Sequence, residues 1–186
     1  VKVKLSESVK KRVSEGISYL YSNTDSNELT DVTKNIAGEL MKAITDNDAL
    51  AVDIGTLKVS DEYTFKHSVD VATMGMVVAR KYGLSDTEVF DIGVAGLLHD
   101  IGKSRISNEL LNKPGRLSEE EFRHMKQHSV YGYEIIKNKS ELKESIKLAV
   151  LQHHEKINGT GYPFGVDSNK ICTFAKILSV VDIYDA

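Results

Sequence analysis

The sequence predicts an all-α protein, and three observations support that fold class. Apolar residues recur at intervals of three and four along most of the chain, which is the period of an amphipathic helix. Alternating apolar and polar residues, the pattern of a half-buried strand, are scarce. Only two prolines interrupt the 186 residues. With 41% hydrophobic and 27% charged residues, the chain can form one good core and a small extra module.

Charge and cysteine content limit the function classes and the compartment. A net charge of −3 argues against binding of duplex nucleic acid, which needs a clustered basic face. The single cysteine, Cys172, cannot form an intrachain disulfide, so we expect a reducing, cytoplasmic location. The chain has no run of about 18 apolar residues, so we expect no membrane segment within it. It begins at Val1 and ends at Ala186 inside a helical pattern, and we expect it to be part of a longer polypeptide.

Two helices are predicted in residues 1–60, which we interpret as an N-terminal helical region or linker. Their apolar stripes run from Leu5 to Leu20 and from Leu29 to Ile44. Glu28 follows Asp25 at the spacing of a capping box, just before the second stripe. No residue here carries recognisable chemistry, so packing or connecting helices are the simplest interpretation.

A third helix, over about residues 61–82, carries the first candidate functional residue. Gly83 fits the position after its end, because glycine adopts the left-handed conformation without steric cost. His67 shares the apolar face of this helix with Val71 and Met74. Taken alone, such a histidine is more often a hydrogen-bonded core residue than a metal ligand.

The fourth helix ends in the most informative pair of the chain, His99-Asp100. Ser85 and Glu88 form a capping box at its start. Residues 93–98 are small and apolar, so we expect this helix to be buried on most sides. An imidazole and a carboxylate buried at its end are costly unless something pairs with them. The partner is a metal ion or, for a lone dipeptide, more simply a hydrogen bond between the two side chains.

Residues 101–117 form a predicted connection rich in glycine and polar residues. A capping box at Ser118 then opens one helix that continues to about Ile136. His124 and His128 share one face of this predicted helix, one turn apart. The helix therefore brings at least one more imidazole toward the interior.

The last third of the chain adds further ligand types. A helix ends in the doublet His153-His154, followed by glycine-rich residues 158–163, which cannot be helical. The backbone N–H groups of that run could bind an anion, or it could be an ordinary turn. The final helix carries Asp182 and Asp185 on its otherwise apolar inner stripe, where carboxylates are expensive without a partner.

Together these residues indicate a metal site. Five of the six histidines lie at inward positions or helix ends, beside two or three inward carboxylates. A structural protein rarely buries so many titratable groups without a metal ion to neutralise them. Imidazole and carboxylate ligands without thiolates favour iron, manganese or zinc in a hydrolytic site. So many ligands favour two adjacent ions, which clamp the attacking and leaving oxygens of a phosphoryl transfer. We therefore interpret the chain as a metal-dependent phosphohydrolase.

A series of motifs narrows this interpretation to one family. The motifs are His67, HDIGK at 99–103, KPG at 113–115, HSVYG at 128–132, HHE at 153–155, NGTGYP at 158–163 and DIYDA at 182–186. In this order and spacing, over about residues 61–186, they resemble the HD-GYP family, the GYP-bearing branch of the HD-domain phosphohydrolases. The resemblance implies an HD-domain bundle of about five core helices, preceded by one or two N-terminal helices. It also implies hydrolysis of the bacterial second messenger cyclic di-GMP at a centre of two or three metal ions, often iron or manganese.

The resemblance also implies a role for each matching residue. The implied metal ligands are His67, His99, Asp100, His128, His153, His154 and Asp182. Asp100 would bridge two ions, and a metal-bridged hydroxide would attack the cyclic phosphodiester. Lys103 would hold a phosphate oxygen, so Asp100 and Lys103 are the implied catalytic residues. The substrate pocket would be shaped by Lys103, Gly161, Tyr162 and Pro163.

Three departures from the family pattern modify these expectations. Three-metal members are expected to carry a glutamate four residues before the first histidine, but Tyr63 occupies that position. Its neighbour Glu62 is turned about 100° away on an ideal helix. We therefore predict two divalent metal ions rather than three. Asn158 stands where many members have aspartate, and the substrate-binding residues that follow DIYDA fall beyond Ala186, so residues 61–186 are an incomplete HD-GYP domain.

The primary hypothesis is a cyclic di-GMP phosphodiesterase that yields pGpG, GMP or both. One alternative is a non-hydrolytic signalling module that binds cyclic di-GMP or partner proteins. Another is a phosphohydrolase for a different nucleotide, including other cyclic dinucleotides. An upstream sensor or receiver domain and signalling partner proteins fit any of these hypotheses.

Overall fold

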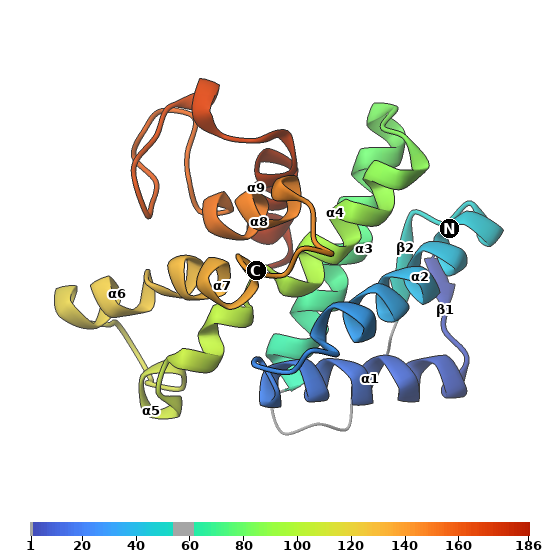
Figure 1. Ribbon diagram of the computed structural model, residues 1–186, viewed down its shortest axis with the longest axis horizontal. Helices are drawn as coiled ribbons and strands as arrows, with labels where there is room; N and C mark the ends of the chain where they lie inside the picture. The colour runs from blue at the N-terminus through green and yellow to red at the C-terminus, as the bar shows by residue number, and fades with distance from the viewer. Residues whose placement is uncertain (1, 54–61) are drawn as a thin grey trace.

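The computed structural model describes residues 2–53 and 62–186, with only the backbone at residue 62. Helices dominate the described chain, which confirms the all-α prediction (Figure 1). The helices are α1 Glu7–Ser22, α2 Leu29–Asn47, α3 Glu62–Tyr82, α4 Asp86–Leu98, α5 Asn108–Leu111, α6 Glu119–Met125, α7 His128–Ile136, α8 Glu144–Gln152 and α9 Thr173–Asp185. Two short 3₁₀ turns accompany them, η1 Ile101–Arg105 and η2 Ser168–Lys170.

A two-stranded sheet near the N-terminus was not predicted. Strand β1 (Lys2–Lys4) pairs in parallel with β2 (Ala51–Asp53), with Val3 opposite Val52. Each strand is three residues long, too short for an alternating pattern to be visible in the sequence. Leu5 consequently lies before α1, which begins only after its N-cap Ser6.

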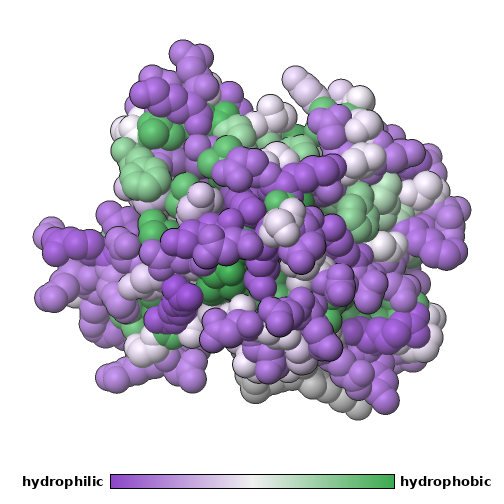
Figure 2. Space-filling model, in the orientation of Figure 1, coloured by the Kyte–Doolittle hydropathy of each residue, from purple (hydrophilic) through white to green (hydrophobic). Residues whose placement is uncertain are grey.

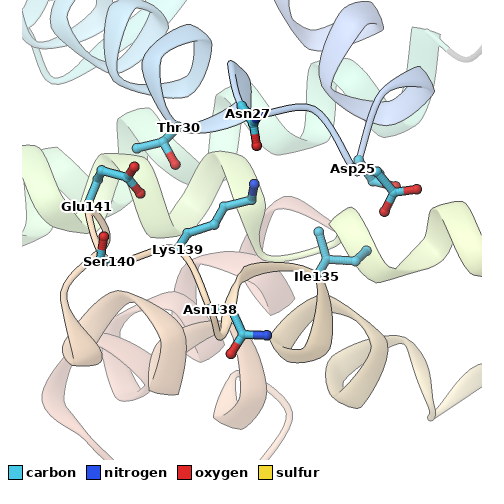
Figure 3. Close-up of a pocket in the computed structure, with 9 residues that line it drawn as sticks. Asp25, Asn27, Thr30, Ile135, Asn138, Lys139, Ser140 and Glu141 are labelled. Carbon is cyan, nitrogen blue, oxygen red and sulfur yellow. The ribbon is translucent and has the colours of Figure 1, made fainter.

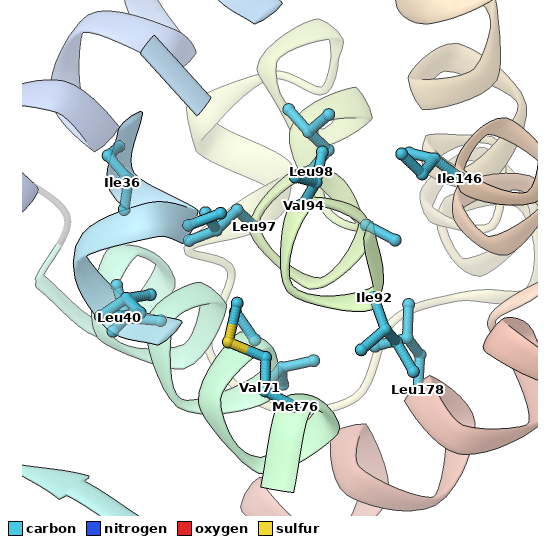
Figure 4. Packing of buried hydrophobic residues seen from close by; sticks show 14 of the residues in the cluster. Ile36, Leu40, Val71, Met76, Ile92, Val94, Leu97, Leu98, Ile146 and Leu178 are labelled. Atoms are coloured by element: carbon cyan, nitrogen blue, oxygen red, sulfur yellow. The ribbon is translucent and has the colours of Figure 1, made fainter. Parts of the chain in front are cut away.

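Helix α4 lies at the centre of the molecule, in contact with α2, α3, α8 and α9. Its residues 92–98 are all buried, as the small apolar run predicts. Figure 4 shows Ile92, Val94, Leu97 and Leu98 pointing into different parts of one continuous core. Gly96 lets α3 approach closely, because a Cβ there would lie 2.6 Å from the Cα of Ala72. This contact fixes the position of α4 relative to α3.

Two predicted capping boxes are confirmed and one is wrong. Ser85 with Glu88 and Ser118 with Glu121 make the reciprocal side-chain and backbone hydrogen bonds of the motif. Before α2, however, Glu28 is the N-cap and makes no capping hydrogen bond through its side chain. Its carboxylate instead accepts a hydrogen bond from the Tyr19 hydroxyl at 3.2 Å.

The single helix predicted from Ser118 to Ile136 is also wrong. It is divided into α6 and α7 by a break at Lys126-Gln127. His128, just after the break, is buried, whereas His124, before it, is exposed. In Figure 1 helices α5 and α6 extend to one side of the bundle.

Polar contacts join the N-terminal helices to the α7–α8 connection, beside the apolar packing of α2 against α4. The Lys139 ammonium donates to the backbone oxygen of Ser26 at 3.1 Å, and Lys34 donates to that of Glu141 at 3.0 Å. Beside these bonds lies a pocket of about 390 Å³ between the α1–α2 and α7–α8 connections (Figure 3). The face in Figure 2 is mostly hydrophilic, with scattered apolar patches. Among the described residues, no helix has the length and apolar character needed to cross a lipid bilayer.

Candidate metal centre

Residues from five helices and their ends meet at the end of α4. His67 comes from α3, His99 and Asp100 follow α4, and His128 opens α7. His153 and His154 follow α8, and Asp182 lies in the last turns of α9. The structure thus brings together all seven residues that the sequence motifs single out as ligands. All are buried except His154, whose side chain is 29% exposed.

Asp100 stands in the middle of this cluster. Its Oδ2 atom lies 3.2 Å from the Nε2 atom of His99 and 3.9 Å from that of His67. Its Oδ1 atom lies 3.4 Å from the Nε2 atom of His128 and 3.6 Å from that of His153. Each carboxylate oxygen therefore faces a different pair of imidazoles, an arrangement suited to a carboxylate between two cations.

Backbone carbonyl groups orient three of the imidazoles. The Nδ1 atoms of His99, His128 and His153 lie 2.6, 2.8 and 2.7 Å from the carbonyl oxygens of Gly96, Met125 and Val150. Each acceptor is three residues earlier in the chain. Because a carbonyl oxygen only accepts, the Nδ1 atom of each ring carries a proton, and the Nε2 atom points toward Asp100. The helix ends thus set both the tautomer and the direction of each ring.

The charges of the cluster are strongly coupled. Burial disfavours a charged His99, but the negative charges of Asp100 and Asp182 outweigh it and raise the pKa of His99 to about 10. Burial would likewise raise the pKa of Asp100, yet His99 and Lys103 hold it well below its usual value. Burial, together with His153 and His128, lowers the pKa of His154 to about 2. The site combines ionised carboxylates with a neutral His154.

These donors fit divalent metal ions. One set of ligand atoms within 4.8 Å of one another comes from Asp100, His128, His153 and His154. A second comes from His67, His99 and Asp100, and a third from His99, His153 and Asp182. The first two sets share Asp100. The buried Nε2 atom of His99 makes no hydrogen bond with any described residue, and an unsatisfied donor or acceptor of this kind indicates a missing ligand partner.

Lys103 and the 158–163 loop border the cluster on its exposed side. Lys103 lies in η1, and its ammonium is 3.0 Å from Asp100 Oδ2, with 28% of its side chain exposed. Gly161 packs directly against the backbone of residues 154–156, where a Cβ would collide. This contact allows the Tyr162 N–H to donate to the His154 carbonyl at 3.1 Å. The Tyr162 ring then stacks on His154, with centroids 4.7 Å apart.

The segment just after the 158–163 loop holds a carboxylate from its own chain. The buried carboxylate of Glu155 accepts hydrogen bonds from the N–H groups of Phe164 at 2.7 Å and Val166 at 3.1 Å. Both donors follow the run 158–163, so anion binding by the backbone of that run stays a prediction. Pro163 follows Tyr162 through a cis peptide bond.

Comparison with known proteins identifies the family. A family model described as an HD domain matches residues 52–186, well over half of the chain. The fold also resembles that of a solved HDG"Y"P protein, Bd1817 from Bdellovibrio bacteriovorus, with a TM-score of 0.74 at 20% identity. That alignment covers 95% of this chain and 58% of Bd1817. The chain belongs to the HD-domain family.

Curated relatives extend the similarity to named enzymes. The chain is 37% identical over 152 residues to the cyclic di-GMP phosphodiesterase PA4108 of Pseudomonas aeruginosa, covering 82% of this chain and 37% of PA4108. It is 41% identical over 124 residues to the 3'3'-cGAMP-specific phosphodiesterase 3 of Vibrio cholerae, covering 67% of this chain and 27% of that protein. The chain therefore spans less than two fifths of the length of these relatives.

Two further residues, which are not among the predicted ligands, contact the His67 ring. Asp185, on the inner stripe of α9, places Oδ2 2.7 Å from the Nδ1 atom of His67. Asp182 lies 2.7 Å from the Nε2 atom of the same ring, so carboxylates contact both of its nitrogens. Tyr63 stacks parallel to His67, with an interplanar angle of 1°. The inner position of Asp185 was visible in the sequence, but its partner was not. Glu62's side chain lies outside the described residues.

Proposed function

We propose that this chain is a metal-dependent phosphodiesterase that hydrolyses cyclic di-GMP to pGpG, GMP or both. The observation that carries the proposal is the position of Asp100, whose two carboxylate oxygens face separate pairs of imidazole Nε2 atoms. Relatives named as cyclic di-GMP and 3'3'-cGAMP phosphodiesterases support the substrate class. Because the chain spans only part of those relatives, its activity is a matter for experiment.

The proposed centre contains two divalent ions, with iron or manganese as the favoured metals. His128, His153, His154 and Asp100 would hold one ion, and His67, His99, Asp100 and Asp182 would hold the other. When bound, two such ions supply a water of lowered pKa and neutralise charge on the attacking and leaving oxygens. Tyr63 supports a count of two, because a phenol stands where a third ion would need a carboxylate.

The chain's own residues orient the substrate in this proposal. The Lys103 ammonium is near enough to Asp100 to donate to a phosphate oxygen beside the centre and stabilise the charge that develops there. Tyr162, held by Gly161 against the His154 backbone, would form one wall of the substrate pocket, and Pro163 would shape its edge. The carbonyl groups that contact Nδ1 of His99, His128 and His153 would keep these rings in place during the reaction.

A turnover assay tests the proposed function. The protein is reconstituted anaerobically with Fe²⁺ or with Mn²⁺ and incubated with cyclic di-GMP, 3'3'-cGAMP or linear pGpG, and the products are separated by chromatography. We expect linear product from cyclic di-GMP. Hydrolysis of 3'3'-cGAMP alone would reassign the substrate within the same class. Binding of cyclic di-GMP without product from either metal form would support a non-hydrolytic signalling module instead.

Elemental analysis of the same samples counts the ions. We expect two per chain after removal of loosely bound metal. Three ions per chain would contradict the interpretation of Tyr63, and none would contradict the metal centre itself.

The wider arrangement is also proposed. Residues 61–186 would form an HD-GYP domain preceded by the N-terminal helical region 1–60, acting in the cytoplasm downstream of a sensor or receiver domain and signalling partners. Support comes from the start of the family match at residue 52 and from a 40% identical relative named as the response regulator RpfG of Xanthomonas campestris.

A further inference from the structure

The imidazoles of the metal centre form a row of ring contacts with a tyrosine at each end. The successive ring pairs are Tyr63–His67 at 5.9 Å, His67–His99 at 5.3 Å, His99–His153 at 5.1 Å, His153–His154 at 4.2 Å and His154–Tyr162 at 4.7 Å between centroids. Both terminal pairs are nearly parallel, with interplanar angles of 1° for Tyr63 and 17° for Tyr162. The tyrosines come from unrelated parts of the chain, α3 and the 158–163 loop.

The two tyrosines border the accessible side of the centre. The side chains of Lys103 and His154 are 28% and 29% exposed, whereas that of Asp100 is 3% exposed. A substrate phosphate therefore reaches the cluster past Lys103 and His154. Tyr63 is 68% exposed although its ring contacts His67, so most of its aromatic surface is open. Burial lowers the pKa of the Lys103 ammonium and Asp100 raises it. The nearby phenol of Tyr63 raises it by a smaller amount.

The chemistry of the substrate matches this arrangement. A phosphodiester that joins two nucleosides carries one base on each side of the scissile phosphate. With the phosphate at Lys103, the two bases of a cyclic dinucleotide extend in opposite directions, and aromatic side chains are the usual stacking surface for bases. The exposed ring of Tyr63 and the half-buried ring of Tyr162, at the two ends of the row, supply two such surfaces.

We propose that Tyr63 is a nucleobase-stacking residue that binds one purine of the cyclic dinucleotide, on the opposite side of the metal centre from Tyr162. This proposal rests on the proposed function and adds a specificity determinant to it. It also gives a role to the residue that stands where three-metal members are expected to carry a glutamate, because a phenol ring can stack on a base and a glutamate side chain cannot. A substrate without a second base gains nothing from Tyr63.

The test compares Tyr63→Ala, Tyr63→Leu and Tyr63→Phe with the wild-type chain on two substrates. Cyclic di-GMP carries two bases, and methyl p-nitrophenyl phosphate is a phosphodiester without any base. We expect Tyr63→Ala and Tyr63→Leu to raise KM and Kd for cyclic di-GMP roughly tenfold, the usual effect of removing one stacked base. Their kcat, metal content and activity on methyl p-nitrophenyl phosphate should stay within about twofold of wild type, and Tyr63→Phe should resemble wild type.

Tyr82→Ala is the matched control, because Tyr82 is another exposed tyrosine, 76% exposed, at the far end of the same helix. It should leave all parameters unchanged. The proposal is overturned if Tyr63→Ala leaves KM and Kd for cyclic di-GMP unchanged. It is also overturned if metal content and both activities fall together, since Tyr63 would then only support His67. Wild-type KM and Kd for cyclic di-GMP in Tyr63→Leu would also overturn it, because an aliphatic side chain would then serve as well as an aromatic ring.

Measuring binding separates this proposal from the proposed function. If the wild-type chain binds cyclic di-GMP without hydrolysing it, the enzyme assignment fails, while weaker binding by Tyr63→Ala still supports the stacking role. If the wild-type chain neither binds nor hydrolyses any cyclic dinucleotide, both proposals are overturned.

Discussion

At the scale of single residues, the site depends on how each side chain is held by a neighbour. Asp100 would be an expensive buried charge if His99 and Lys103 did not offset its desolvation. His99, His128 and His153 each use one nitrogen to contact a backbone carbonyl and leave the other for the centre. A metal ligand set described without these partners would omit what fixes its geometry.

Replacing Asp100 should abolish turnover. Asp100→Ala removes the one carboxylate that faces both pairs of imidazoles, so we expect kcat to fall by about a thousandfold or more and both ions to be lost. Elemental analysis and the product assay measure the two effects. Asp31→Ala, which removes an exposed carboxylate from α2, is the control and should retain both ions. Two ions and normal turnover in Asp100→Ala would contradict the proposed bridging role.

Replacing Asp185 should weaken one ion selectively. Asp185 contacts the Nδ1 atom of His67, and loss of such an outer partner typically costs about 10–100-fold in metal affinity. We expect Asp185→Ala to lose the ion at His67 first in a chelator titration, with the other ion retained. Asp185→Asn keeps an oxygen acceptor for the Nδ1 proton and should lie between Asp185→Ala and wild type. Equal weakening of both ions would argue against a local role.

At the scale of elements, close backbone contacts set the positions of the ligands. Gly96 brings α4 onto α3, and Gly161 brings the 158–163 loop onto residues 154–156. Gly102 in η1 packs against the backbone of His128 and Gly132 in α7. Each contact joins two ligand-bearing segments at a distance that a Cβ would not permit.

The α3–α4 contact predicts a stability difference between two glycine substitutions. Gly96→Ala places a methyl group against the backbone of Ala72, so we expect a loss of about 1–3 kcal/mol in the free energy of unfolding. In α2, Gly38 has no atom within 4 Å of an added Cβ. Gly38→Ala should therefore stabilise the protein by about 0.4–1 kcal/mol. Urea denaturation followed by circular dichroism measures both, and a neutral Gly96→Ala would contradict the close packing.

Glu155 should determine how well the 158–163 loop and the residues that follow it, up to Val166, are ordered. Its carboxylate accepts from two loop N–H groups, and a glutamine offers one oxygen without the charge. We expect Glu155→Gln to speed amide hydrogen exchange at Phe164 and Val166 and to raise KM for cyclic di-GMP severalfold by loosening Tyr162. Glu144→Gln, an exposed change at the start of α8, should alter neither quantity. Unchanged exchange in Glu155→Gln would contradict this role.

At the scale of the whole molecule, the N-terminal helices share one core with the helices of the site. Leu20, Leu29 and Leu40 belong to the same buried cluster as Leu97 and Leu98 of α4. Figure 4 shows Ile36 and Leu40 on the side of the cluster that faces Leu97. The pocket in Figure 3 lies between the same halves, and two lysine-to-carbonyl hydrogen bonds join them beside it. The domain boundary predicted near residue 60 therefore separates two regions that share one apolar core.

A core substitution far from the centre tests how strongly the two regions are coupled. Leu40 is fully buried in α2, so Leu40→Ala should cost about 2–5 kcal/mol of stability. If the regions unfold together, circular dichroism and release of bound metal will show one shared, lowered transition. Leu50→Ala, at a side chain that is 54% exposed, should change the midpoint little. Two separate transitions in Leu40→Ala would support an independent N-terminal region.

How far the sequence leads depends on whether a feature is local. The all-α class, the buried α4 and two capping boxes follow from periodicity and from residues three apart, and these predictions are confirmed. The break between α6 and α7 and the short parallel strands escaped prediction. The strands depend on pairing between residues distant in the chain, Val3 with Val52, which local propensity does not contain.

The sequence by itself determined the family, because its motifs place ligand types at spacings that few folds share, and it singled out seven residues that the structure brings together. Only the tertiary structure decided how those residues face one another. The contact of Asp185 with His67 joins residues 118 positions apart, and the row of rings from Tyr63 to Tyr162 spans α3 and a distant loop. Such contacts form only when the helices pack, because packing determines which side chains that are distant in the chain become neighbours.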